Sequence, residues 1–195
     1  MKKTIAITGT TRGIGKAISD LLQEEGHNVI SLSRSTGFDL KLPWDQLEHK
    51  LYPVIKHADI FINNAHFDFT QTKILQYLFA NWKNVDDKAI INISSTAGDK
   101  KQDTKGQWAN YQVQKIALDE ACKQLEGMGK CKVTNIRPGW VNTDALEGIQ
   151  KPIGITILKP KDIATTVLHI INQPAEIHIK NISIEPWYKN SKKGI

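Results

Sequence analysis

The sequence predicts an α/β fold in which a doubly wound, mainly parallel sheet is flanked by helices. Two observations carry this prediction. Strand-like and helical patterns alternate almost from one end of the 195-residue chain to the other, as they do when crossover helices connect parallel strands. A glycine-rich turn over residues 9–15 also joins the first strand pattern directly to the first helical pattern.

The expected strands are short runs rich in β-branched and apolar residues. The last run alternates isoleucines with other residues, which is typical of a strand. A very short third strand is expected after a tight turn at Gly37. The expected strands cover residues 4–8, 28–33, 38–40, 60–63, 89–94, 132–136 and 177–184.

The expected helices place apolar residues three and four positions apart. The first follows the glycine turn and ends near Gly26, and the second opens at Pro43, which suits the first turn of a helix. The last expected helix covers residues 160–171. The apolar stripes of the other four helices are Ala17, Ile18, Leu21 and Leu22; Leu47, Leu51, Val54 and Ile55; Ile74, Leu75, Leu78, Phe79 and Trp82; and Val113, Ile116, Ala117, Ala121 and Leu125.

Length and composition limit the possible classes of protein. A chain of 195 residues suits one domain, and no apolar run approaches the 18 residues of a membrane span, so we expect neither a second domain nor a membrane partner. The net charge of +6 is spread along the chain, so no nucleic-acid partner is expected. Cys122 and Cys131 lack metal-ligand spacing, so we expect no metal and no disulfide framework, which fits a reducing cytoplasm.

The glycine turn predicts a dinucleotide site. Gly9, Gly13 and Gly15 lie between the first strand and the first helix, where backbone N–H groups and the helix dipole favour a pyrophosphate. Glycines alone also serve ordinary turns, but the strand before and the helix after them favour a Rossmann-type dinucleotide site.

Five ordered motifs extend along most of the chain. They are Thr8-Gly9-x-x-x-Gly13-x-Gly15, Asn63-Asn64-Ala65, Ile93-Ser94-Ser95, Tyr111-x-x-x-Lys115 and Pro138-Gly139-x-x-x-Thr143. This series resembles the short-chain dehydrogenase/reductase family, and the segment 174–186 continues the resemblance. The resemblance implies an oxidoreductase of this type that acts on CH–OH and C=O groups with a nicotinamide dinucleotide.

The end of the second strand predicts NADP(H) as the cofactor. Ser33-Arg34-Ser35 stands where an acidic residue would select NAD(H), and Arg34 with Arg12 can clamp a 2′-phosphate, the alternative being two solvated surface arginines. By resemblance, Asp39 meets the adenine, with a loop or N-cap role as the alternative. The expected cofactor-binding residues are Gly9, Thr11, Arg12, Gly13, Ile14, Gly15, Ser33, Arg34, Asp39, Leu40, Asn64, Ala65, Tyr111, Lys115, Pro138, Gly139, Val141 and Thr143.

Tyr111 is the expected acid/base, with Lys115 and Ser95 as its catalytic partners. Residues four apart share one face of a helix, and the Lys115 ammonium would lower the pKa of Tyr111 and ease proton transfer. The pair alone also suits an ordinary amphipathic helix. By resemblance, Ser95, in preference to Ser94, donates a hydrogen bond to the substrate oxygen. The resemblance also implies that Lys115 holds the hydroxyl groups of the nicotinamide ribose.

The sequence departs from the family near residues 66–71. In the family an asparagine supports a water-mediated proton relay. Its place falls near Phe67 or Asp68 in this chain, and no asparagine stands there. Asp68 or Gln71 is the remaining candidate to hold the water. His66 replaces a glycine and, near the cleft, would titrate around neutral pH unless it is simply a loop residue. Segments after Ser35 and after His66 are shortened, as is the substrate lid at 145–158, which predicts a more open site.

We therefore expect an NADP(H)-dependent enzyme that interconverts a small carbonyl and an alcohol. The alternative is a weakly active or inactive NADP(H)-binding sensor or scaffold. The resemblance implies a homodimer or homotetramer, formed through the helices that carry residues 74–82 and 111–125. The tryptophans at 82, 108, 140 and 187 are expected in the core or an interface rather than against substrate.

Overall fold

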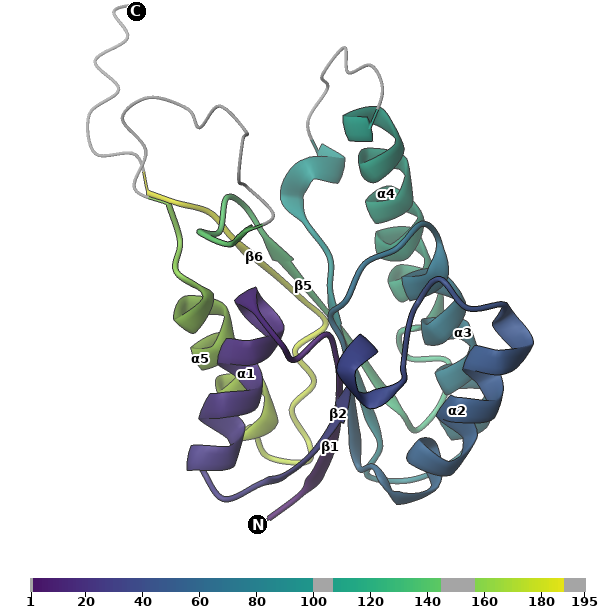
Figure 1. The fold of residues 1–195 in the computed structure, drawn as a ribbon. Helices are drawn as coiled ribbons and strands as arrows, with labels where there is room; N and C mark the ends of the chain where they lie inside the picture. The colour runs from purple at the N-terminus through teal and green to yellow at the C-terminus, as the bar shows by residue number, and fades with distance from the viewer. Residues whose placement is uncertain (1, 100–106, 145–156, 188–195) are drawn as a thin grey trace, which may run out of the picture.

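A parallel sheet runs through the middle of the molecule (Figure 1). The computed structural model describes residues 2–99, 107–144 and 157–187, and within these ranges the sheet has six strands in the order β2-β1-β3-β4-β5-β6. Every neighbouring pair is parallel. The strands are β1 (Thr4–Thr8), β2 (Asn28–Leu32), β3 (Ile60–Asn63), β4 (Ala89–Ile93), β5 (Lys132–Pro138) and β6 (Asn181–Ile184).

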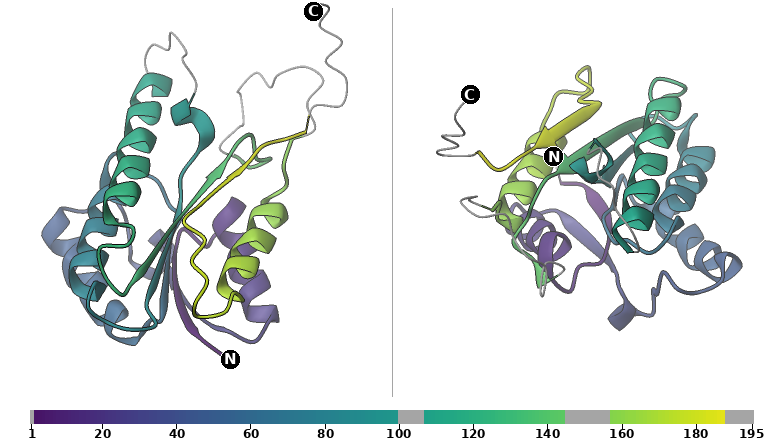
Figure 2. Two further views of the ribbon diagram at one scale, coloured as in Figure 1. Left: turned by 180° about the vertical axis from the view of Figure 1, so that it is seen from behind. Right: turned by 90° about the horizontal axis from the view of Figure 1, so that it is seen from above.

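Helices cover both faces of the sheet, as the views in Figures 1 and 2 show. The helices α1 (Gly13–Glu24) and α5 (Pro160–Ile171) pack against each other on one face. The opposite face carries α2 (Trp44–His57), α3 (Thr70–Trp82) and α4 (Gln107–Leu125). The predicted doubly wound, mainly parallel α/β fold is thereby confirmed.

The chain reverses its direction across the sheet between β1 and β3. From β1 it crosses to β2 at one edge, and it then returns to β3 on the other side of β1. Open α/β sheets bind ligands at the carboxyl ends of the strands beside such a switch point. The segments that follow β1 and β3 therefore border the expected crevice.

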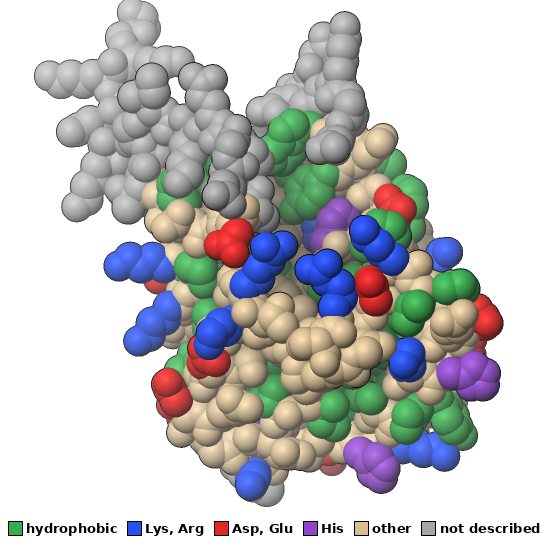
Figure 3. All heavy atoms as spheres, in the orientation of Figure 1, with side chains coloured by type: hydrophobic (Ala, Val, Ile, Leu, Met, Phe, Trp, Pro, Cys, Tyr) green, Lys and Arg blue, Asp and Glu red, His purple; other side chains and the backbone are tan. Residues whose placement is uncertain are grey.

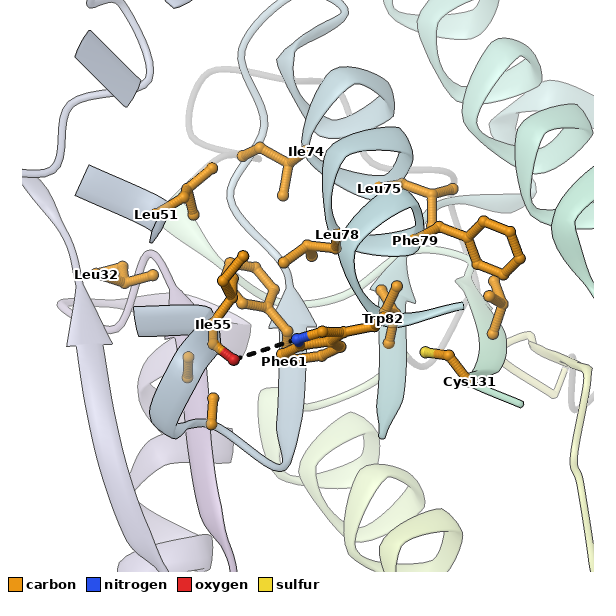
Figure 4. Close-up of a cluster of buried hydrophobic side chains, with 14 of the residues drawn as sticks. Leu32, Leu51, Ile55, Phe61, Ile74, Leu75, Leu78, Phe79, Trp82 and Cys131 are labelled. Atoms are coloured by element: carbon orange, nitrogen blue, oxygen red, sulfur yellow. Dashed lines mark hydrogen bonds between the residues drawn. The ribbon is translucent and has the colours of Figure 1, made fainter. Parts of the chain in front are cut away.

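Each face of the sheet packs its own hydrophobic core. Successive side chains of a strand point to opposite faces, so Ile5 and Ile7 of β1 join the core beneath α1 and α5, whereas Ala6 joins the core beneath α2, α3 and α4. In the second core the indole Nε1 of Trp82 donates a hydrogen bond to the Ile55 carbonyl at 3.1 Å (Figure 4). Trp82 is therefore a core residue, as expected.

The expected third strand at residues 38–40 is wrong. After β2 the chain turns through a short 3₁₀ helix, η1 (Arg34–Thr36), and Gly37 adopts a left-handed conformation with φ 79°. The Phe38 N–H returns to the Ser33 carbonyl at 2.8 Å rather than pairing with a neighbouring strand. Phe38 and Leu40 are still buried, because the turn delivers their side chains to the core.

The last strand begins later than expected, because side chains replace its first ladder bonds. The His178 ring contacts the Val133 carbonyl at 2.9 Å, and the Thr134 hydroxyl donates to the Ile179 carbonyl at 2.7 Å. Regular pairing starts only where Asn135 faces Asn181. The other expected strands and helices occur, with differences at their ends such as the start of α4 at Gln107.

No helix in the described part of the chain is long and apolar enough to cross a membrane.

Candidate active site

A cavity of about 410 Å³ lies at the switch point, which is within the usual size of a small-molecule site. The glycine turn forms its floor. Gly9 has a φ of 76°, and a Cβ atom on Gly15 would overlap the Gly9 carbonyl oxygen and lie 2.5 Å from Nδ2 of Asn64. Both positions therefore require glycine if the backbone is to keep this turn.

The first turn of α1 faces this cavity. Arg12, Gly13, Ile14 and Gly15 line it, and Arg12 is the N-cap residue without a side-chain hydrogen bond to the helix. The first N–H groups of a helix lack partners within the helix and favour anions. The lining thus suits the pyrophosphate of a dinucleotide.

The segment after β3 braces the glycine turn. The Thr8 hydroxyl accepts hydrogen bonds from the backbone N–H groups of Asn64 and Ala65, each at 2.9 Å. The Asn64 side-chain amide donates to the Thr8 carbonyl at 2.9 Å. These contacts hold the two sides of the crevice at a fixed separation.

Basic side chains surround the opening of the cavity. Arg12, Arg34 and Lys41 line it, and Figure 3 shows Lys and Arg side chains gathered on this face, with acidic side chains among them. Arg12 lies 3.7 Å from Asp144 in an exposed ion pair. The Asp39 carboxylate accepts the Lys41 backbone N–H at 3.1 Å, a local contact that matches the loop role considered for Asp39.

The structure brings most of the expected cofactor-binding residues to this cavity. The glycine turn, Thr11, Ser33, Leu40, Asn64, Ala65 and Thr143 all line it. The expected residues outside its lining are Tyr111, Lys115, Pro138, Gly139 and Val141. Sequence reasoning did not name Leu32, Phe38, Lys41, Phe67 and Asp144 as cavity residues.

The three expected catalytic residues meet beyond the end of β4. The Ser95 side chain lies close enough to Tyr111 to lower its pKa by hydrogen bonding, and Nζ of Lys115 lies 5.5 Å from the centre of the Tyr111 ring. The Ser95 hydroxyl also accepts the Ala97 N–H at 3.1 Å and lies 3.4 Å from the Pro138 carbonyl. Ser94, in contrast, is buried, and its hydroxyl has no hydrogen-bond partner among the described residues.

The pKa of Tyr111 differs from the sequence-based expectation. Burial raises it above its usual value, although the hydrogen bond with Ser95 acts in the opposite direction. Burial also lowers the pKa of Lys115 to about 7, against the opposing effect of Asp119. The expected lowering of the Tyr111 pKa is absent from the protein alone, because burial of the phenol itself is the largest effect on this pKa.

Gln71, in the first turn of α3, connects three elements around Lys115. Its Nε2 donates to the Asn63 carbonyl at 2.8 Å and to the Ile93 carbonyl at 3.1 Å, while its Oε1 accepts from Nζ of Lys115 at 2.7 Å. Asp68, the other substitute for the missing asparagine, instead accepts from the half-buried Gln114 at 3.2 Å. Only Gln71 of these two candidates reaches Lys115.

His66 lies against Tyr111. Its ring centroid is 5.0 Å from that of Tyr111, in an edge-to-face arrangement. Burial, followed by the effect of Lys115, lowers the pKa of His66 to about 3. This direction opposes the expectation that His66 titrates around neutral pH, because partial burial and the Lys115 charge both disfavour the protonated ring.

The aromatic ring of Trp108 also contacts Tyr111. The ring centroids are 5.9 Å apart, and Trp108 itself lies 6.3 Å from Trp140. Trp108 is 42% exposed, so it is not a core residue. The expected shortened lid at 145–158 lies outside the described residues except at its last two positions, where Leu158 forms a β-bridge with Val141.

The fold and this site define a Rossmann-type α/β protein with a Ser-Tyr-Lys group beside a cavity of about 410 Å³ at the glycine turn. No family model matches the chain. An uncharacterized oxidoreductase of Staphylococcus aureus (strain MRSA252) is 28% identical in an alignment of 229 residues, which covers 94% of this chain and 97% of the relative. The alignment is longer than this chain of 195 residues, so the chain is a shortened one beside this relative.

Solved structures share the fold. An oxidoreductase of the short-chain dehydrogenase/reductase family from Burkholderia thailandensis has a TM-score of 0.76 and 18% identity, covering 94% of this chain and 91% of its own. The 3-alpha-hydroxysteroid dehydrogenase from Pseudomonas sp. B-0831, complexed with NADH, has a TM-score of 0.74 and 17% identity over 93% and 95% of the two chains.

A third structure holds a related cofactor. The alcohol dehydrogenase from the archaeon Thermococcus sibiricus, complexed with 5-hydroxy-NADP, has a TM-score of 0.70 and 16% identity over 98% of this chain and 100% of its own. The fold implied by the resemblance to the short-chain dehydrogenase/reductase family is confirmed by these solved structures.

Proposed function

We propose that this protein is an NADP(H)-dependent short-chain dehydrogenase/reductase that interconverts a small carbonyl compound and the corresponding alcohol. The observation that carries the proposal is the meeting of Ser95, Tyr111 and Lys115 beyond the end of β4, beside the cavity of the glycine turn. A scaffold would have no need of such a group.

The cavity fits the adenosine and pyrophosphate parts of the cofactor. The backbone of residues 9–15 would hold the pyrophosphate, Asp39, Leu40 and Ala65 would surround the adenosine, and Thr143 would extend the site toward the nicotinamide. When bound, the reduced nicotinamide supplies a hydride to the carbonyl carbon of the substrate.

The residues of the chain then handle the oxygen of the substrate. Ser95 donates a hydrogen bond that orients the carbonyl and stabilises the charge that develops on its oxygen. Tyr111 donates its phenolic proton to that oxygen, and it accepts the proton in the reverse direction. Lys115 holds the nicotinamide ribose and favours the phenolate through its positive charge.

The preference for NADP(H) rests on charge around the cavity. Arg12, Arg34 and Lys41 are cations in its lining, and the residue directly after β2 is Ser33 rather than an acidic residue. An NADP(H) 2′-phosphate would form charge-assisted hydrogen bonds with the arginines. The structures with this fold include complexes with NADH and with 5-hydroxy-NADP, so the fold is compatible with either cofactor.

A panel of carbonyl compounds tests the proposal. The purified protein is expected to oxidise NADPH in the presence of at least one small ketone or aldehyde, measured as a loss of NADPH absorbance. Binding of NADPH, detected by fluorescence, without oxidation by any compound would favour the sensor or scaffold instead. No binding of either NADPH or NADH would overturn both.

The proposed enzyme acts as one domain over residues 1–195 and assembles as a homodimer or homotetramer in the cytoplasm. The outer face of α4 carries the apolar side chains Val113 and Ile116, which are 55% and 49% exposed. Such a face favours a helix-to-helix interface between copies. Light scattering during gel filtration measures the assembly, and a monomer would contradict it.

A further inference from the structure

The buried amide of Gln71 connects the carboxyl ends of two strands with the helix that carries Tyr111. Only 2% of Gln71 is exposed, and its Nε2 donates to backbone carbonyls at the ends of β3 and β4. Amide oxygen and nitrogen atoms are distinguished by their partners, and two carbonyl acceptors around one atom require it to be Nε2. The opposite end of the amide must then be the acceptor Oε1.

That acceptor faces Nζ of Lys115. The distance is 2.7 Å, which is typical of a charge-assisted hydrogen bond, and Lys115 is only 3% exposed. Nζ also donates to the Ile93 carbonyl at 3.2 Å. Among the described residues, these two acceptors take two of the three N–H donors of the ammonium. The third N–H is then free to donate toward the nicotinamide ribose of the proposed cofactor.

We propose that Gln71 is a positioning residue that holds the Lys115 ammonium directly with its side-chain amide, in place of an asparagine-supported water relay. The amide fixes the direction of Nζ and stabilises its charged form without adding a charge of its own. This inference rests on the proposed function for its catalytic meaning, but the contact itself is independent of turnover.

The surroundings of Lys115 explain why such a partner matters. The titratable groups that face it are Tyr111, Asp119 and Cys122 from its own helix, and His66 from the segment after β3. Asp119 is already engaged by Arg137, with Nε to Oδ2 at 3.0 Å, and by Asn135. Gln71 is therefore the side chain that accepts directly from Nζ, and losing it would leave a buried ammonium with one fewer acceptor.

A lysine titration tests the contact without any substrate. Protein labelled with ¹³C at lysine Cε is titrated by NMR, with Lys115→Met identifying the Lys115 signal. In Gln71→Leu the midpoint for Lys115 is expected to fall by about 1 to 2 pH units, because a charge-assisted hydrogen bond is lost. Gln76→Leu on the exposed face of the same helix is the matched control and should leave the midpoint unchanged.

A shorter amide keeps the test decisive if Gln71→Leu does not fold. Gln71→Asn retains an amide, but its stem is one methylene too short to reach both the strand carbonyls and Nζ, so the midpoint should fall in the same direction. An unchanged Lys115 midpoint in the folded Gln71 variants would overturn the proposal and leave Gln71 as a brace between strands.

Kinetics then connect the contact to catalysis. With a substrate from the carbonyl panel, kcat in Gln71→Leu should fall about tenfold or more at pH 7, and the pH profile should move downward with the Lys115 midpoint. Unchanged kinetics together with a lowered midpoint would also overturn the catalytic role of the contact. If no substrate is found, the proposed function fails while the NMR titration still decides whether Gln71 holds Lys115.

Discussion

The imidazole of His66 lies edge-on against the phenol ring of Tyr111, with ring centroids 5.0 Å apart. The family that the sequence resembles has a glycine at this position, so the contact is a departure of this chain. Burial is the main cause that raises the pKa of Tyr111, and the His66 ring is one of the groups packed against it. The replacement of a glycine by His66 thus places a side chain where it affects the surroundings of Tyr111, the expected proton donor.

His66 should make the fold sensitive to acid. Its pKa is about 3 in the folded protein and 6.5 when exposed, so between these pH values the unfolded chain binds a proton that the folded protein does not. The stability from neutral His66 is fully present above pH 6.5 and decreases as the pH falls toward 3.

The variant His66→Phe keeps a ring against Tyr111 but cannot bind a proton. Its free energy of unfolding in urea, compared between pH 7 and pH 4.5, should depend less on pH than that of the unmodified protein. His49→Phe at an exposed position of α2 is the control and should retain the original dependence. Equal pH dependence in His66→Phe and the unmodified protein would refute the role of His66.

Loss of the Tyr111 hydroxyl should separate chemistry from binding. Tyr111→Phe removes the proton donor, so turnover should fall by a factor of about 10² to 10⁴, while the cavity at the glycine turn should still bind NADPH. Stopped-flow turnover and NADPH fluorescence measure the two effects. Tyr52→Phe at a half-exposed position of α2 should change neither, and substantial turnover in Tyr111→Phe would exclude Tyr111 as the acid/base.

The sequence predicted the sheet well where hydrophobic burial alone decides the structure. Strands such as β3 and helices such as α5 occur where the apolar patterns placed them, because their side chains fill the two cores. The expected strand at residues 38–40 failed for a different reason. Phe38 and Leu40 are apolar and buried, but hydrogen bonds within the turn from Ser33 keep their backbone away from a strand partner.

The site shows the same limit. The motif residues Ser95, Tyr111 and Lys115 were predictable, since their order and spacing resemble a known family. The partner of Lys115 was left open between Asp68 and Gln71, because both stand near the altered position in the sequence. Only the first turn of α3 decides between them: it turns Gln71 inward toward Lys115, whereas Asp68 accepts from Gln114 nearer the surface.

Arg34 should determine the choice of cofactor. Arg34→Asp replaces a cation in the cavity lining by an anion, which repels a 2′-phosphate and can hydrogen-bond a ribose 2′-hydroxyl. The ratio of kcat/KM for NADPH to that for NADH should fall by about 100-fold or more, corresponding to roughly 3 kcal/mol. Lys161→Asp makes the same charge change at an exposed position of α5 and should leave the ratio unchanged. An unchanged ratio in Arg34→Asp would show that Arg34 does not select the cofactor.

Substitutions at Gly15 and Gly26 distinguish two reasons for glycine, the close approach of another backbone atom and a strained φ angle. A Cβ atom on Gly15 would overlap the Gly9 carbonyl, which belongs to the backbone and cannot rotate away, so Gly15→Ala must open the turn. At Gly26 a Cβ atom would meet nothing within 4 Å, but the φ of 80° is strained for alanine by about 1 to 2 kcal/mol.

The two variants should therefore fail in different ways. Gly26→Ala should lower the free energy of unfolding by that strain and leave the Kd for NADPH unchanged. Gly15→Ala should raise the Kd more than about tenfold, because the displaced N–H groups no longer converge on the pyrophosphate. Fluorescence titration measures the Kd, and urea unfolding measures the stability. If Gly15→Ala bound NADPH as tightly as the unmodified protein, the turn between β1 and α1 would not be the pyrophosphate site, and the cavity would need another ligand.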